Sequence, residues 1–222
     1  MSYAIPTAEF VRLIDYAVLK TTVTDADVLK GAEYALEMNF ASFCTYPQFM
    51  PNVARVLEGS KVAPSAVIAF PNGNFPPKMK VAESVYALDG GATELDIVMN
   101  LSAFASEYYA YVKEEIAAVV EVAHAKNALV KVIIESCHWN TQLLTLACLL
   151  VGDGGADFVE TSTGFAHGGA DWFKTQVMCM SVKQPLGVKA SGGIKTRERA
   201  EQYAQMGCAR LGIGSAIKDI MR

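Results

Sequence analysis

Five charged residues of both signs stand at or near the ends of short apolar segments that are predicted to be buried strands. They are Asp96, Lys131, Glu135, Glu160 and Lys189. A strand buried on both faces is normally apolar throughout, and an unpaired buried charge is costly. Five such charges at the mouth of one fold would pair, and could also transfer protons or act as nucleophiles. A structural network of ion pairs that plugs the interior is the alternative interpretation.

Three turns rich in glycine and hydroxyl side chains follow the late apolar segments, at residues 161–164, 191–193 and 212–215. Backbone N–H groups at a helix N-terminus bind phosphate, and each turn is predicted to lie at such a position. The candidate phosphate-binding residues are Thr161, Thr163, Gly164, Ser191, Gly192, Gly193, Gly214 and Ser215. Tight turns without a ligand are the alternative interpretation.

The elements that must position these residues alternate along the whole chain. Strands are predicted at residues 14–19, 41–45, 66–70, 93–98, 129–135, 157–160, 187–190 and 210–212. Helices are predicted from Thr24 onward, where Asp27 completes a capping box, and at 77–88, 107–125, 141–150, 171–182, 196–206 and 215–221. This βα repeat predicts a parallel sheet. About eight such units favour an α/β fold that forms a single (β/α)8 TIM barrel.

An open, doubly wound sheet is the alternative fold. It would usually place its phosphate loop early in the chain, whereas the phosphate site of a barrel usually follows strands 7 and 8. The glycine-rich turns of this chain come late, which favours the barrel. No linker rich in proline, glycine or serine divides the sequence, so residues 1–222 are predicted to form one domain.

Composition excludes several classes of partner. The 222 residues are 52% hydrophobic and 19% charged, which allows a large core and argues against disorder. The net charge of −4 has no basic run, so no nucleic-acid partner is expected. No apolar run reaches the ~18 residues of a membrane span, and residues 1–10 do not resemble a secretory signal.

The cysteines and histidines give no metal motif. The five cysteines are Cys44, Cys137, Cys148, Cys179 and Cys208, with no CxxC pair among them. This number and spacing predict reduced thiols in a cytoplasmic protein, without disulfides. His124 and His138 have no partner at metal-ligand spacing, so we expect no metal.

Seven segments, in order, resemble the deoxyribose-phosphate aldolases, a family of class I (Schiff-base) aldolases. They are residues 14–20, 41–47, 70–73, 94–100, 131–135, 157–165 and 188–194. The last two are the most specific. Val159-Glu160-Thr161-Ser162-Thr163-Gly164 and Lys189-Ala190-Ser191-Gly192-Gly193-Ile194 each resemble a strand that runs into a glycine turn in the family.

The resemblance implies reversible aldol cleavage of 2-deoxyribose 5-phosphate into acetaldehyde and glyceraldehyde 3-phosphate, without metal or organic cofactor. Asp96 would relay protons through a bound water. Lys189, and Lys131 beside it, would lower the pKa of a nucleophilic lysine by like-charge repulsion. Asp15 and Cys44 would lie near the substrate, although Cys44 is equally well explained as a core cysteine. The three glycine turns would form one cradle for a sugar phosphate.

The position of the family's imine-forming lysine is held by Glu160. A carboxylate cannot condense with an aldehyde, so covalent catalysis of the family type stops here. Three interpretations remain open: a variant inactivated at its nucleophile, a homologue that binds sugar phosphates without cleaving them, or an enzyme of related chemistry. The last could use Lys189, or Glu160 as the base of a phosphosugar isomerase. We expect an ion pair between Glu160 and Lys189. We also expect a homodimer.

Overall fold

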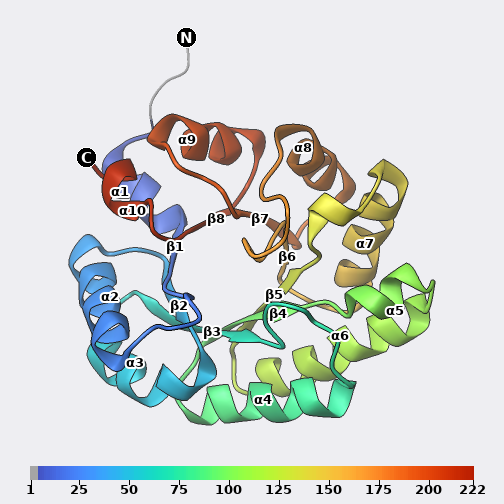
Figure 1. Ribbon diagram of the computed structural model, residues 1–222, viewed down its shortest axis with the longest axis horizontal. Helices are drawn as coiled ribbons and strands as arrows, with labels where there is room; N and C mark the ends of the chain where they lie inside the picture. Colours follow the sequence, from blue (N-terminus) through green and yellow to red (C-terminus); the bar gives the residue numbers. More distant parts are fainter. Residues whose placement is uncertain (1–4) are drawn as a thin grey trace.

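Eight parallel strands pair in chain order, and strand β8 returns to pair with β1, so that residues 5–222 of the computed structural model contain a closed barrel (Figure 1). The helices form a ring outside it. This confirms the α/β fold class and the single (β/α)8 barrel. Residues 1–4, which belong to the segment compared with a secretory signal and to the predicted domain, lie outside the described residues.

All eight predicted strands exist. They are β1 (Ile14–Ala17), β2 (Ser42–Thr45), β3 (Ala63–Ile68), β4 (Glu94–Val98), β5 (Leu129–Ile133), β6 (Phe158–Glu160), β7 (Gly187–Ser191) and β8 (Arg210–Ile213). Several predicted ends were wrong, among them the end of β1, which stops at Ala17, and the start of β3, which lies at Ala63. Strands β3 and β5 stop early because Ala69 and Glu135 adopt positive φ angles of 54° and 48°. A left-handed residue turns the chain out of the strand direction.

The helices are α1 (Thr7–Phe10), α2 (Asp25–Met38), α3 (Met50–Leu57), α4 (Pro77–Asp89), α5 (Leu101–Ala105), α6 (Tyr109–His124), α7 (Thr141–Asp153), α8 (Trp172–Ser181), α9 (Arg197–Met206) and α10 (Ile217–Ile220). The capping box of α2 is present, with Thr24 accepting from the Asp27 N–H group. Helices α1, α3 and α5 were not predicted: α1 and α3 are short and have no side-chain N-cap, and α5, although capped by Asn100, has only five residues. Among the described residues, no helix has the length and apolar character of a membrane span.

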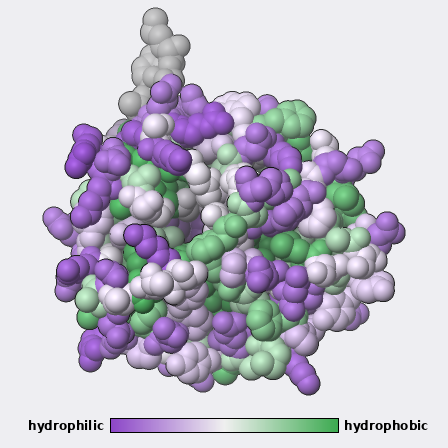
Figure 2. Space-filling model, viewed as in Figure 1, coloured by the Kyte–Doolittle hydropathy of each residue, from purple (hydrophilic) through white to green (hydrophobic). Residues whose placement is uncertain are grey.

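Side-chain alternation along the strands separates an apolar layer from a charged interior. In β4, Leu95 and Ile97 belong to the apolar core, while Asp96 between them forms ion pairs with lysines of other strands. Successive strand residues point to opposite faces, so one face of each strand packs on the helices and the other faces into the barrel. Figure 2 shows the outside of the same molecule, where hydrophilic side chains dominate the rim.

Candidate active site

A network of seven charged side chains fills the barrel interior. Its members are Asp15, Glu94, Asp96, Lys131, Glu160, Lys189 and Arg210, and we call it the ion-pair cluster. Six strands supply it, because each residue stands at an inward position of its strand. All except Arg210 are at least 96% buried at the side chain. The cluster is therefore closed to bulk water from most sides.

Lys189 pairs with three carboxylates of the ion-pair cluster. Its Nζ lies 2.6 Å from Asp96 Oδ2, 3.1 Å from Glu160 Oε1 and 3.2 Å from Asp15 Oδ2. Glu160 and Lys189 are direct partners in the register of β6 and β7. The contact confirms the ion pair that we expected from the sequence.

Lys131 lies deeper, in the middle of β5, and contacts Asp96 at 2.8 Å, Asp15 at 3.4 Å and Glu94. Arg210 closes the network by binding Glu94 at 2.7 Å and also Asp15. The prediction that Lys131, Asp96 and Lys189 stand at strand ends was therefore wrong, because each is the middle residue of its strand. These contacts make Lys131 a counter-ion for the buried carboxylates of the ion-pair cluster.

Within the described chain, the ion-pair cluster holds four carboxylates and three cations, which leaves one negative charge in excess. Burial, opposed by Lys189 and reinforced by Asp96, raises the pKa of Glu160 to about 7. Burial alone would lower the pKa of Lys189, but Asp96, Glu160 and Asp15 outweigh it and raise that pKa well above its ordinary value. Both shifts favour the protonated form, through burial for Glu160 and through the neighbouring carboxylates for Lys189.

Asp96 differs from Glu160 in its balance of neighbours. Burial would raise the pKa of Asp96, but Lys131 and Lys189 outweigh it and hold that pKa below its ordinary value. Two carboxylates in one site therefore take different protonation states, with Asp96 ionised and Glu160 near its midpoint at neutral pH. Such a separation of pKa values is typical of acid–base sites.

A cavity of about 890 Å³ opens above the ion-pair cluster. The predicted residues that line it are Cys44, Asp96, Glu160, Thr163, Gly164, Lys189, Ser191, Gly192, Gly193, Gly214 and Ser215. Asp15, Lys131 and Thr161 are not among the lining residues. Asp15 and Lys131 lie below the floor, and the Thr161 hydroxyl donates a hydrogen bond to the Ser191 carbonyl at 2.9 Å. Thr161 therefore joins two strand ends, and a ligand in the cavity does not meet it directly.

The Cys44 thiol lies on the cavity floor, with Sγ 3.4 Å from Asp96 Oδ2. Burial, together with Asp96, raises the pKa of this thiol well above its ordinary value. A thiolate is the nucleophilic form of cysteine, so Cys44 is held as a neutral thiol. Its position near the predicted substrate pocket is as expected.

The three glycine turns lie side by side because β6, β7 and β8 are neighbours, but their expected position at helix N-termini was wrong for the first two. Helix α8 begins only at Trp172 and α9 at Arg197, while the third turn precedes the four-residue helix α10. The backbone conformation and the close packing at position 192 both require glycine. The φ of Gly192 is +83°, and a Cβ there would lie 3.1 Å from Gly169 Cα.

Glu135 was predicted in the charged group, but it lies outside the ion-pair cluster. Its carboxylate accepts hydrogen bonds from the N–H group (3.2 Å) and the hydroxyl of Thr163. The left-handed turn at Glu135 moves this side chain away from the barrel axis. Glu135 therefore anchors the loop after β6.

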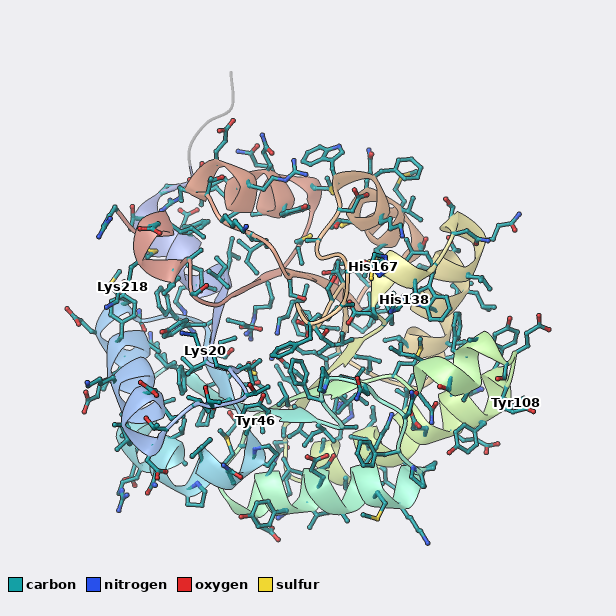
Figure 3. All side chains as sticks on the ribbon, viewed as in Figure 1. Lys20, Tyr46, Tyr108, His138, His167 and Lys218 are labelled. Atoms are coloured by element: carbon teal, nitrogen blue, oxygen red, sulfur yellow. The ribbon has the colours of Figure 1, made fainter. Side chains whose placement is uncertain are left out.

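Several residues of the site were not predicted from the sequence. Glu94 and Arg210 belong to the ion-pair cluster, and the signal for Glu94 was its two-residue spacing from Asp96 on one face of a strand. Lys20 and Lys195 line the cavity with exposed side chains, and Lys20 lies inside the ring of helices (Figure 3). Among the described residues, Ser162 Oγ and Glu160 Oε2 are buried without a hydrogen-bond partner, and both residues line the cavity.

The raised pKa of Glu160 predicts that the folded protein loses stability as the pH rises. This carboxyl titrates near 4.5 when unfolded and at about 7 when folded. The folded state therefore holds an extra proton between these values, so its stabilising effect is complete below about 4.5 and lost as the pH rises through 7, by about 3 kcal/mol.

Urea unfolding between about pH 5 and pH 8 measures this loss. Glu160→Gln should remove most of it, whereas Glu58→Gln, at an exposed position, should leave it unchanged. Equal pH profiles for the wild type and Glu160→Gln would contradict the raised pKa.

A closed (β/α)8 barrel with a ligand-sized cavity at one end of its strands belongs to the class of barrel proteins that bind ligands at the C-terminal face. The family is shown by comparison: the model of the DeoC/LacD family of aldolases matches residues 10–214. The chain belongs to this family.

Individual relatives are similar over nearly their full length. The deoxyribose-phosphate aldolase of Clostridium novyi is 42% identical over 206 residues, which cover 93% of this chain and 92% of the relative. That of Thermococcus kodakarensis is 41% identical over 212 residues, with 95% of each chain covered. The tetrameric deoxyribose phosphate aldolase structure from Aeropyrum pernix superimposes with a TM-score of 0.90 at 31% identity, covering 97% of this chain and 91% of that one.

Proposed function

We propose that this chain binds a small sugar phosphate, of the 2-deoxyribose 5-phosphate type, in the barrel mouth and does not form an imine with it. The observation that carries this is the buried Glu160–Lys189 ion pair, 3.1 Å apart, at the position where the resemblance places the imine-forming lysine. The names of the relatives supply the substrate class.

The chemistry of the buried amines supports the absence of an imine. Attack on an aldehyde needs a neutral amine. The carboxylates around Lys131 and Lys189 outweigh burial and raise the pKa of both. Both amines are therefore protonated at neutral pH, and neither replaces the missing nucleophile.

The phosphate end of the ligand would lie against the glycine turns. Gly193, Gly214 and Ser215 line this part of the cavity together with Lys195. Backbone N–H groups and a lysine ammonium are both phosphate ligands. The carbonyl end would then face Glu160 and Lys189, where Ser162 offers an additional hydroxyl.

A second function is favoured by the pKa of Glu160, which burial raises to about 7. A carboxylate poised near the operating pH is suited to general acid–base catalysis. Glu160 could then remove a proton next to the sugar carbonyl, as a phosphosugar isomerase does. Lys189 would stabilise the charge that develops on the carbonyl oxygen.

Binding without cleavage is the expected result with 2-deoxyribose 5-phosphate. A ligand at about 100 times its Kd should stabilise the fold by about 2.7 kcal/mol, seen as a rise in Tm. Lys195→Ala should reduce the rise, whereas Lys183→Ala, an exposed lysine in the connection before β7, should not. Borohydride should trap no adduct, and a coupled assay should show no turnover near the median enzyme rate of about 10 per second.

Solvent exchange separates the two candidate functions. In D₂O, an isomerase would incorporate deuterium next to the carbonyl of a bound sugar phosphate, and Glu160→Gln would abolish this. A binding protein would incorporate none. No thermal response to any sugar phosphate or to inorganic phosphate would remove both functions. The homodimer and the cytoplasmic location stay predictions.

A further inference from the structure

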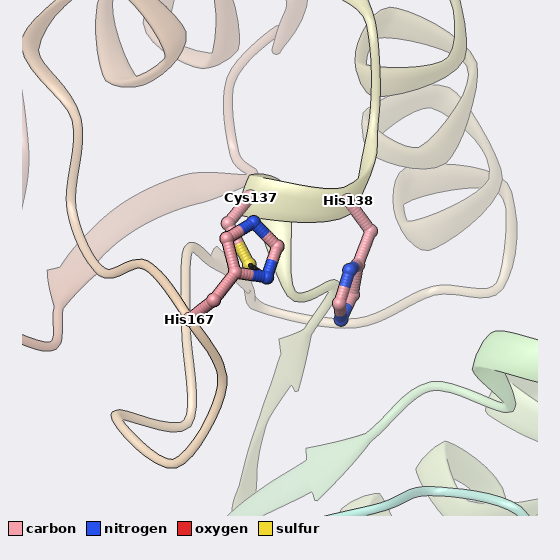
Figure 4. Close-up of side chains that lie close together, drawn as sticks. All are labelled: Cys137, His138 and His167. Atoms are coloured by element: carbon pink, nitrogen blue, oxygen red, sulfur yellow. Dashed lines mark hydrogen bonds between the residues drawn. The ribbon is translucent and has the colours of Figure 1, made fainter.

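We propose that Cys137, His138 and His167 form a binding site for a zinc-like divalent transition metal at the rim of the barrel mouth. The Cys137 thiol and one ring nitrogen from each histidine lie within 4.8 Å of one another. Cys137 Sγ is 3.8 Å from His167 Nδ1. Figure 4 shows the three side chains facing one common space, with His167 reaching in from the loop between β6 and α8.

The donor set determines the class of metal. A thiolate with two imidazoles suits Zn²⁺ and similar borderline metals rather than Mg²⁺ or Ca²⁺, which prefer oxygen. Tetrahedral zinc with bonds of about 2.0–2.3 Å places its ligand atoms roughly 3.5 Å apart. The Cys137–His167 pair already approaches this spacing. The His138 donor atom lies within 4.8 Å of the other two, so this exposed side chain has to come closer by at most about 1.3 Å to reach that spacing.

The backbone that carries Cys137 and His138 is fixed before any metal binds. Lys174 Nζ donates hydrogen bonds to the carbonyls of Ser136 (2.8 Å) and Cys137 (3.1 Å). On the other side, Trp139 Nε1 donates to the Ile134 carbonyl at 2.6 Å. These two proposed ligands therefore lie on a short 3-10 turn, Ser136–His138, that is held at both ends.

The His167 loop is held against this turn. Gly168 packs so closely that a Cβ there would lie 2.8 Å from Cys137 Cβ. Thr163, earlier in the loop, binds Glu135, whose Oε1 also lies 3.9 Å from Cys137 Sγ. A carboxylate next to the ligands favours a cation and can orient a metal ligand from outside the coordination shell.

The site borders the proposed ligand pocket. His138 lines a second cavity of about 620 Å³ together with Glu135, Thr163 and Phe165. Thr163 and Phe165 also line the main cavity. Three protein ligands leave one coordination position of a tetrahedral metal open, so an ion bound here could take a further ligand at the rim.

Titration of the metal-free, full-length chain with Zn²⁺ tests the site. Calorimetry should give one equivalent bound, and Co²⁺ in place of Zn²⁺ should give a near-ultraviolet thiolate-to-metal absorption band. Because changes outside the coordination shell already cost about 10–100-fold in metal affinity, Cys137→Ser, His138→Gln and His167→Gln should each weaken binding at least about 10-fold. Circular dichroism verifies that each variant is folded.

His124→Gln and Cys179→Ser are matched controls, because they remove the same donor types elsewhere on the chain. Both should bind Zn²⁺ like the wild type. No saturable binding, a Co²⁺ spectrum without the thiolate band, or unchanged affinity in any of the three site variants would overturn the proposal. None of these outcomes depends on sugar-phosphate binding, so the proposal fails or stands independently of the function proposed above.

Discussion

Glu160→Lys should give the chain an amine that forms an imine with acetaldehyde, and should raise retro-aldol turnover at least about 100-fold, since losing a nucleophile can cost about 10⁶-fold. The reason is the charge balance of the ion-pair cluster. With glutamate it holds four carboxylates and three cations. With lysine it would hold three carboxylates and four cations, and the excess positive charge would favour loss of a proton from one amine.

Glutamate and lysine at position 160 are therefore expected to respond in opposite ways: the carboxylate takes up a proton, and the ammonium loses one. Burial penalises the charged form of either residue: it raises the pKa of Glu160 to about 7, and it would lower the pKa of a lysine at the same position. Excess positive charge would be relieved when a lysine becomes neutral, which is the form that attacks an aldehyde. Lys189 would then act as the neighbouring charge that lowers the pKa of the new amine.

Borohydride reduction in the presence of acetaldehyde, followed by peptide mass spectrometry, is the measurement. The adduct should map to position 160, and a coupled assay with 2-deoxyribose 5-phosphate should show turnover. Glu160→Gln and Glu160→Met are controls that remove the carboxylate without adding an amine, and neither should form an adduct. An adduct on a different lysine, or none at all, would show that the roles taken from the family resemblance do not transfer.

Lys189→Met should lower the free energy of unfolding by about 3–5 kcal/mol. Lys189 contacts Asp15, Asp96 and Glu160. Its removal would leave four buried carboxylates with two cations, and a buried charge without a partner is costly. Adding Glu160→Gln should recover part of the loss, because it removes one of the stranded carboxyl charges.

A double-mutant cycle measured by urea unfolding determines this coupling. The control is Lys126→Met, which breaks a pair with Asp89 whose side chains are 46% and 61% exposed. Its effect should stay within about 0.5 kcal/mol. Additive effects of Lys189→Met and Glu160→Gln would mean that the two side chains do not share a buried network.

Much of the fold could be predicted from the sequence because it depends on local patterns. The βα repeat and the late glycine turns predicted the barrel, and all eight strands overlap the ranges that were predicted for them. The pairing of Glu160 with Lys189 followed from adjacent strands and was confirmed. The glutamate at position 160, where the family resemblance places an imine-forming lysine, was also visible in the sequence, because it depends on residue type alone.

Which charged side chains form ion pairs was decided only by the tertiary structure. Glu94 and Arg210 stand far apart in the chain and join the ion-pair cluster because closure of the barrel brings β8 and β4 to one interior. Glu135 leaves that cluster because its left-handed backbone re-aims the side chain.

The burial that raises the pKa of Glu160, and the approach of Cys137 and His138 to His167, are likewise properties of the folded chain. Local sequence sets which face of a strand a residue occupies. Contacts across the barrel and between its loops depend on strand register and on loop conformations that are stabilised by distant residues. The sequence by itself therefore determined the barrel and the carboxylate at position 160, and the tertiary structure decided the protonation of the site and the residues around it.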